Sequence, residues 1–239
     1  MTSSIDLTSG ITPIEHSSVY ELVVEQLRRA IHMGTYAPGE KLPPERELSQ
    51  LLQVSRLSVR EAIRVLEGEG YVETRRGATG GIVVLDRGIE EKRIGPYIRE
   101  MLPRIREIFE FRAALEPDAA RLAATRRTDE QLHRLEEAHS HIDESLETRH
   151  FRLADSQFHL GIADAAQNSW MREAVERSRS AIWMPADQLY DHVFRTATAH
   201  HGQILDAIRA RDGDTAAEMM REHLAFTVVD LEKIAEHGE

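Results

Sequence analysis

The change of hydrophobic period near residue 70 is the feature that most constrains the fold of this chain. Apolar residues recur at i, i+3, i+4 and i+7 from Val59 to Leu66, and this spacing predicts a helix with one buried face. Two short apolar runs follow at once, YVETRR and IVVL. The glycines of the GATGG segment between them can take positive φ at a hairpin tip. A helix is therefore expected to lead directly into a β-hairpin.

Two further helices are predicted upstream of this helix. The first covers about Ile14 to Met33 and ends at GTYAPGE, and the second is PPERELSQLL, whose prolines suit a helix start. The apolar side of the second helix consists of Leu48, Leu51 and Leu52. The order helix, helix, turn, helix and hairpin is that of a winged helix-turn-helix. We expect this domain over residues 14–87, after a flexible polar arm at residues 1–13.

The rest of the chain, residues 88–239, predicts only helices. A first piece at 89–102 is expected to be interrupted by Pro103, and a long alanine-rich helix follows. The later segments lie near 129–147, 150–166, 169–190, 194–211 and 214–236. The predicted fold is mainly α, with an N-terminal winged helix-turn-helix followed by an all-α bundle of six or seven helices.

Composition narrows the classes of function. The absence of cysteine excludes disulfides, thiolate metal sites and a cysteine nucleophile. No secretory signal and no run of about 18 apolar residues can be recognised, which predicts a cytoplasmic protein without a membrane partner. The net charge of −11 argues at first against nucleic acid. Residues 1–87, however, hold ten Lys and Arg against twelve Asp and Glu, so most of the acidity lies in the second part.

Arginines on the predicted third helix suggest a surface that binds DNA. Arg56, Arg60 and Arg64 are spaced i, i+4, i+8 and share a face beside the apolar stripe. A guanidinium fork can bind guanine or phosphate, and the helix N-terminus near Ser55 adds amide donors. Further arginines that extend this patch are Arg46, Arg75 and Arg76. The alternative is that the arginines only pair with neighbouring acids, which are Glu45, Glu61, Glu67 and Glu73.

A carboxylate and an imidazole lie on the apolar stripe of one predicted helix in the second part. Asp155 and His159 are one turn apart, in a run that also turns Phe151, Phe158 and Ile162 inward. A buried carboxylate is costly unless it is paired or binds a metal. Two more inward histidines, His201 and His223, lie eleven residues before and after Asp212, within the turn RDGD.

Positions equidistant from the turn of a helical hairpin come level, so the imidazoles of His201 and His223 are expected to meet. Together with Asp155 and His159 they would form a site for a divalent ion, with Zn²⁺ favoured and Ni²⁺ and Mn²⁺ as alternatives. His200 is an alternative ligand to His201, although it lies less centrally on the stripe. The opposing interpretation is that these residues are hydrogen-bonded core residues that hold no metal.

The N-terminal part resembles the DNA-binding domain of the GntR family of bacterial transcription regulators. The motifs that carry the resemblance are PGEKLPPEREL, VSR, VREAIRVLEGEGYV and the glycine-rich wing. The resemblance implies DNA contacts at Arg46, Ser55, Arg56, Arg60, Arg76 and Gly77. The chain departs from the family at Leu57, where a small polar residue is common. The family fold implies that Leu57 faces DNA, where its side chain could contact a thymine methyl group.

The second part resembles the FCD ligand-binding domain of the FadR subgroup over about residues 90–232. The motifs are FEFRAALEPDAARLAA, DSQFHLGIADAAQN and AHHGQILDAIRARDGDTAAEMMREHL. Metal-containing members have an Asp, a His four residues later and two His from the last helices, and these map onto Asp155, His159, His201 and His223. The resemblance also implies that Arg112 holds the carboxylate of an effector, although an ion pair with Glu116 is the alternative. Weaker effector candidates are Asn168 and Arg195.

These features predict a ligand-responsive transcription regulator, most simply a repressor, and not an enzyme. A homodimer would read a two-fold operator in double-stranded DNA, and a small organic acid bound at the metal would control the affinity for that operator. Lactate-like, sugar-acid, dicarboxylic and longer acids remain open as effectors. The alternatives are a metal-dependent hydrolase, which lacks a general base or an HExxH motif here, and a regulator whose bundle only dimerises.

Overall fold

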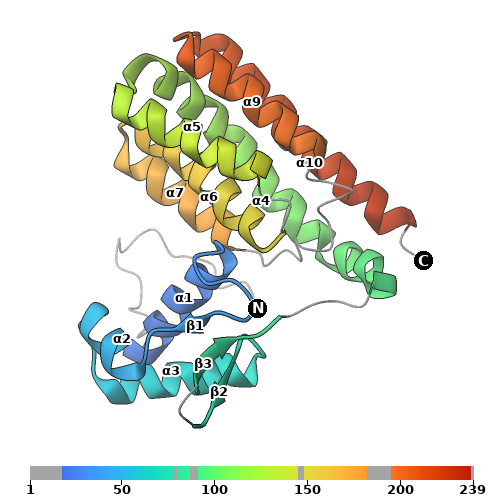
Figure 1. The fold of residues 1–239 in the computed structure, drawn as a ribbon. Helices are drawn as coiled ribbons and strands as arrows, with labels where there is room; N and C mark the ends of the chain where they lie inside the picture. Colours follow the sequence, from blue (N-terminus) through green and yellow to red (C-terminus); the bar gives the residue numbers. More distant parts are fainter. Residues whose placement is uncertain (1–17, 78–79, 87–90, 145–147, 182–194, 238–239) are drawn as a thin grey trace, which may run out of the picture.

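The computed structural model describes residues 18–77, 80–86, 91–144, 148–181 and 195–237 (Figure 1). Its N-terminal part contains three helices and a small sheet, which together form a winged helix-turn-helix. The helices are α1 (Val19–His32), α2 (Glu45–Leu51) and α3 (Arg56–Gly68), and the strands are β1 (Lys41–Leu42), β2 (Val72–Arg75) and β3 (Gly81–Val84).

The third helix is the centre of the N-terminal core. Ser55 caps α3, because its Oγ accepts a hydrogen bond from the Ser58 amide at 3.0 Å. The apolar stripe of α3, with Val59 and Leu66 fully buried, packs against α1 and the sheet. This arrangement leaves the opposite face of α3 to the solvent, where its arginines lie.

The sheet is antiparallel and has the strand order β1-β3-β2. Strands β2 and β3 form the predicted hairpin, in which Val72 pairs with Val84 and Arg75 with Gly81. Strand β1 pairs with β3 and was not predicted, because two residues are too few to show a period. The prediction that Leu51 is buried was wrong: Leu51 is 65% exposed at the end of α2, whereas Leu48 is buried and Leu52 packs partly buried against the core.

The second part of the chain is a helical bundle. Its helices are α4 (Glu91–Arg126), α5 (Asp129–Glu144), α6 (Thr148–Ala165), α7 (Ser169–Ser180), α9 (Arg195–Arg209) and α10 (Gly213–His237). Its main core contains large, fully buried side chains from α6, α9 and α10. None of the helices among the described residues is long and apolar enough to cross a membrane. The predicted fold class, a winged helix-turn-helix followed by an all-α bundle, is confirmed.

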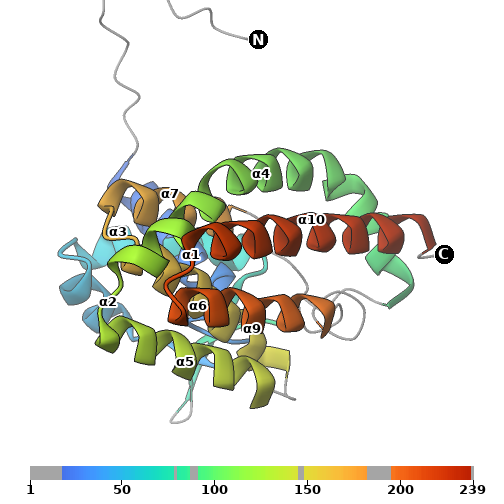
Figure 2. The ribbon, with the colours of Figure 1, turned by 90° about the horizontal axis from the view of Figure 1, so that it is seen from above.

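The predicted interruption at Pro103 was wrong. One helix, α4, runs from Glu91 to Arg126 with Pro96, Pro103 and Pro117 inside it. A proline removes one helical hydrogen bond, and tertiary packing can outweigh that loss. Here Ile98 and Ile105 on either side of Pro103 are fully buried in a small core shared with α10. Figure 2 shows the first part of α4 bent away from the axis of the rest, beside α10.

Candidate metal centre

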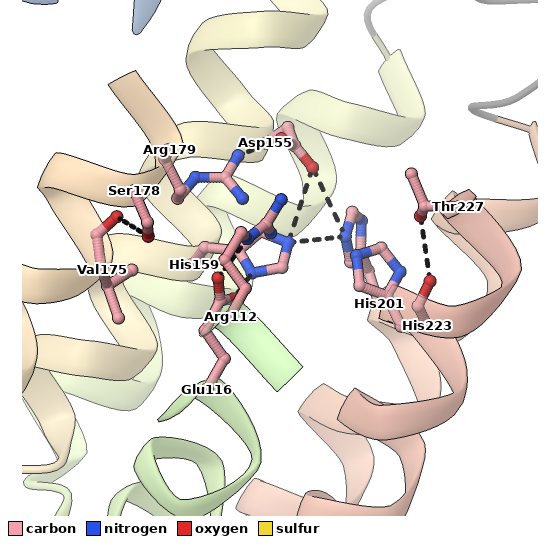
Figure 3. Close-up of polar contacts among 10 residues, drawn as sticks. All are labelled: Arg112, Glu116, Asp155, His159, Val175, Ser178, Arg179, His201, His223 and Thr227. Atoms are coloured by element: carbon pink, nitrogen blue, oxygen red, sulfur yellow. Dashed lines mark hydrogen bonds and ion pairs between the residues drawn. The ribbon is translucent and has the colours of Figure 1, made fainter. Parts of the chain in front are cut away.

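Three helices bring the predicted metal ligands together inside the bundle (Figure 3). Asp155 and His159 come from α6, His201 from α9 and His223 from α10. The turn at residue 212 sets α9 and α10 antiparallel, and the ring centroids of His201 and His223 lie 4.4 Å apart. The three histidines are between 0 and 4% exposed. The hairpin therefore places its two imidazoles level with the α6 pair.

The spacing of the donor atoms suits a tetrahedral ion. One nitrogen from each of the three histidines lies within 4.8 Å of the others, and His159 Nε2 is 3.3 Å from His201 Nε2. Asp155 Oδ1 is 3.5 Å from His201 Nε2 and 3.7 Å from His159 Nε2. Ligand atoms at about 2.05 Å from a tetrahedral Zn²⁺ would lie about 3.3 Å apart. Only small side-chain movements would close these donors around an ion.

The imidazoles are in the protonation state that binds metals. Burial lowers the pKa of His201 to about 4 and holds the pKa values of His159 and His223 well below the ordinary value. All three rings are thus neutral near pH 7, with a nitrogen lone pair available. Burial alone would raise the pKa of Asp155, but the Arg179 guanidinium, with help from the neighbouring imidazoles, lowers it to about 2. Asp155 is therefore an ionised carboxylate.

Two buried ring nitrogens argue against a fully hydrogen-bonded core at this site. The Nδ1 atoms of His201 and His223 are buried and make no hydrogen bond with the residues that the structure describes. Buried polar atoms are normally paired, because each unpaired one costs roughly 1–3 kcal/mol. His201 turns Nε2, not Nδ1, toward the other donors, so the unpaired atoms show only that the cluster is not a fully hydrogen-bonded network. A set of three neutral imidazoles and one carboxylate is instead the donor set that Zn²⁺ prefers.

Two residues that the sequence analysis did not place at the site hold the ligands in position. Glu116 of α4 accepts a hydrogen bond from His159 Nδ1 at 2.6 Å, which leaves His159 Nε2 for an ion. Arg179 of α7 pairs with Asp155 Oδ2 and leaves Oδ1 facing the imidazoles. The only sequence signal for Arg179 is its position four residues after the buried Val175.

The predicted effector residues lie in three different situations. Arg112 is 8% exposed, donates to Glu116 Oε1 at 2.5 Å and lies over the Phe109 ring, so the alternative ion pair is present. Asn168 caps α7, where its side chain accepts hydrogen bonds from two backbone amides. The side chain of Arg195 lies outside the described residues. His200 stacks on Phe226, and it is His201 that joins the cluster.

Replacing Glu116 by Gln is expected to weaken Zn²⁺ binding by about 10- to 100-fold without removing a ligand. Outer-shell partners of metal-bound histidines typically contribute this much, because they fix the tautomer and raise the basicity of the ring. Competition with a chromophoric chelator measures the affinity. Glu137→Gln on the surface of α5 is the matched control and should bind as the wild type does. Equal affinities for the two variants would contradict the role of Glu116.

The predicted DNA-contact residues are all exposed. Leu57 is 65% exposed, and the further exposed residues are Arg46, Ser55, Arg56, Arg60, Arg76 and Gly77. Gly77 has φ +106°, which suits glycine at the wing tip. Three arginines do pair with acids, as the alternative proposed: Arg60 with Glu45, Arg64 with Glu61 and Arg75 with Glu73. Exposed pairs contribute only about 0–1 kcal/mol, so phosphates or bases can replace the acids.

Arg60→Ala is expected to weaken specific DNA binding by about 1–3 kcal/mol, as for a bidentate contact to a base. The probe is a duplex that the wild-type protein selects from a random pool, and the measurement is fluorescence anisotropy. Arg221→Ala removes an equally exposed arginine from α10, where it pairs with Glu218, and should leave the affinity unchanged. If Arg60→Ala bound this duplex as tightly as the wild type, Arg60 would not contact a base.

A winged helix-turn-helix joined to a helical bundle with a buried cluster of metal-ligand type defines a class of DNA-binding protein that carries its own ligand domain. Residues 19–84 match the family model "Bacterial regulatory proteins, gntR family", and residues 107–226 match the model "FCD domain". FCD domains commonly bind a metal.

Similar proteins are regulators. The chain is 34% identical to the Uxu operon transcriptional regulator of Escherichia coli (strain K12), over 86% of this chain and 83% of the relative. It is 30% identical to the HTH-type transcriptional repressor NanR of Cronobacter sakazakii, over 92% of this chain and 88% of the relative. The solved structure titled "E. coli McbR/YncC" aligns over 91% of this chain and 99% of the solved chain, with 20% identity and a TM-score of 0.56. The two proteins therefore share the fold.

This chain belongs to the GntR family of bacterial regulatory proteins and carries an FCD domain, as the sequence motifs predicted. It is a transcription regulator. The matching families and relatives are transcriptional regulators and not enzymes, which confirms the prediction that this chain is not an enzyme. The alternative of a metal-dependent hydrolase is therefore set aside.

Proposed function

We propose that this regulator is a repressor whose affinity for operator DNA is controlled by a small organic acid bound beside a divalent ion in the helical bundle. The observation that carries the proposal is the convergence of three buried, neutral imidazoles with the ionised Asp155. When bound, the ion would act as a Lewis acid that accepts an oxygen of the effector. Zn²⁺ fits the donors best, and Ni²⁺ and Mn²⁺ are alternatives.

The charges around the site favour an anionic effector. Two guanidinium groups, Arg112 and Arg179, face two carboxylates, Asp155 and Glu116, and these formal charges cancel. The three imidazoles add none, because they are neutral. A divalent ion therefore leaves the buried site with two uncompensated positive charges, which is costly in a low-dielectric interior. A carboxylate bound to the ion would offset part of this charge, with Arg112 close by.

The relatives and the family support the mode of DNA binding. Regulators of the GntR family bind operator DNA and typically dimerise. A homodimer would present two copies of α3 to a two-fold operator, one for each half-site. The relative from Cronobacter sakazakii is named a repressor, which supports repression as the action of this regulator. If the effector lowers the affinity of the protein for operator DNA, operator DNA must lower the affinity of the protein for the effector by the same factor.

A thermal-shift screen of small carboxylates tests the proposal. A compound that binds the folded protein raises its melting temperature. We expect at least one lactate-like, sugar-acid or dicarboxylic compound to stabilise the zinc-loaded protein but not the protein treated with chelator. The same compound should release a duplex selected by the wild-type protein.

Two variants sharpen the screen. Arg112→Met should lose the carboxylate response, and Arg134→Met, an exposed arginine of α5, should keep it. A bundle that only dimerises would show no carboxylate-dependent stabilisation with or without Zn²⁺, and this result would overturn the proposal.

A further inference from the structure

Helix α1 lies next to the bundle (Figure 1), and a histidine at its end touches α7. His32 is 8% exposed, and its Nδ1 lies 2.7 Å from the backbone oxygen of Ser180, the last residue of α7. A carbonyl oxygen can only accept, so Nδ1 carries the proton. Nε2 is hydrogen-bonded to the Tyr71 hydroxyl at 2.9 Å. The imidazole of His32 thus joins α7 to the residue that precedes strand β2.

A second contact lies two residues further along the chain. Gly34 has φ +79°, and a Cβ atom at this position would come 2.7 Å from the backbone nitrogen of Leu153 in α6. The turn after α1 therefore packs backbone against backbone on α6, and only glycine fits for both conformational and steric reasons. Leu153 lies two residues before Asp155.

Both contacts fall on the helices that hold the candidate metal centre. Ser180 directly follows Arg179, whose guanidinium pairs with Asp155 Oδ2. One turn earlier on α7, Glu176 pairs with Arg29 of α1 at 3.6 Å. The chain of contacts from the site to the wing thus runs through Asp155, Arg179, the Ser180 carbonyl, His32 and Tyr71.

We propose that His32 is the residue that couples the state of the metal centre to the placement of the DNA-binding domain. The inference rests on the proposed function and adds to it the route of regulation. On that route it is Asp155 that faces the imidazoles, through Oδ1. An ion bound there redirects the Asp155 carboxylate and with it Arg179. Because Arg179 stands at the last turn of α7, its movement displaces the carbonyl that His32 binds. The site can shift the DNA-binding domain only through contacts that differ between the two states.

Hydrogen exchange of the full chain, with Zn²⁺ alone as the probe, tests this coupling. In the wild type we expect Zn²⁺ to slow exchange in α6, α9 and α10 and also to change exchange at residues 32–36 and 71–75. In His32→Ala the response of the bundle should remain, and the response of both segments of the DNA-binding domain should be lost. Tyr71→Phe removes only a hydroxyl, and it should lose the response at 71–75 while keeping that at 32–36.

Gln26→Ala is the control on the same helix, because Gln26 is exposed and the variant is expected to keep the full response. No response to Zn²⁺ in the wild-type bundle would refute the metal centre itself. A bundle response without any change in the DNA-binding domain would overturn the coupling alone. So would an unchanged DNA-binding-domain response in His32→Ala or, should that variant fail to fold, at residues 71–75 in Tyr71→Phe.

Discussion

Replacing His201 by Ala is expected to abolish stoichiometric Zn²⁺ binding, with a loss of affinity of more than about 100-fold. Outer-shell changes alone typically cost 10- to 100-fold, and His201 is at the centre of the donor set, 3.3 Å from His159 Nε2 and 3.5 Å from Asp155 Oδ1. Metal content after dialysis and competition with a chelator give the stoichiometry and the affinity. Asp155→Ala should lose the ion as well.

His200→Ala is the matched control for this prediction. His200 is the neighbouring residue, but its ring stacks on Phe226 with centroids 4.9 Å apart, outside the group of converging nitrogens. Its removal should leave one ion per chain. If His201→Ala bound Zn²⁺ as the wild type does, or if His200→Ala lost it, the assignment of the ligand would be wrong. Wild-type protein that purifies without metal and takes none up would instead favour a purely structural cluster.

The helical hairpin explains why part of the site could be predicted from sequence. The turn at 211–214 fixes which residues of α9 and α10 are level, so the meeting of His201 and His223 follows from counting along the chain. The inward direction of Asp155 and His159 follows from the apolar stripe of α6. Both arguments use local periodicity together with one short connection, and these are the properties that a single sequence displays.

The supporting residues could not be predicted because they depend on tertiary packing. Glu116 is 43 residues from His159 and Arg179 is 24 residues from Asp155, and no short turn relates their helices. The error at Pro103 has the same origin. Local rules end a helix near a proline, whereas α4 continues because Ile98 and Ile105 bury themselves against α10. At Pro103, burial against a distant helix outweighed the local preference for ending the helix.

Metal-free protein is expected to lose stability steeply as the pH falls from about 6.5 toward 4. Burial lowers the pKa of His201 from 6.5 to about 4. Between these two pH values His201 is protonated in the unfolded chain and neutral in the folded protein. The unfolded state then binds more protons in this range, and the free energy of unfolding decreases with decreasing pH. The pKa change of His201 alone corresponds to about 3 kcal/mol. His159 and His223, whose pKa values are also lowered, add to the loss in the same direction.

Asp155 acts in the same direction at a lower pH. Its pKa of about 2 in the folded protein is below the ordinary value of 3.8, so the stability that its charge contributes is complete above pH 4. That contribution disappears as the pH falls toward 2. The histidines and the carboxylate therefore act in separate windows, and the loss between pH 6.5 and 4 reports on the imidazoles.

Urea unfolding of the chelator-treated protein at several pH values measures this loss. His201→Leu removes one titrating group from the core, so its stability should fall by about 3 kcal/mol less than that of the wild type over the same range. His133→Gln removes an exposed histidine of α5 that pairs with Glu137, and it should follow the wild-type curve. A wild-type stability that stays constant from pH 6.5 to 4.5 would mean that the imidazoles accept protons in the folded state. The three buried imidazoles would then not be the neutral metal ligands that their burial implies.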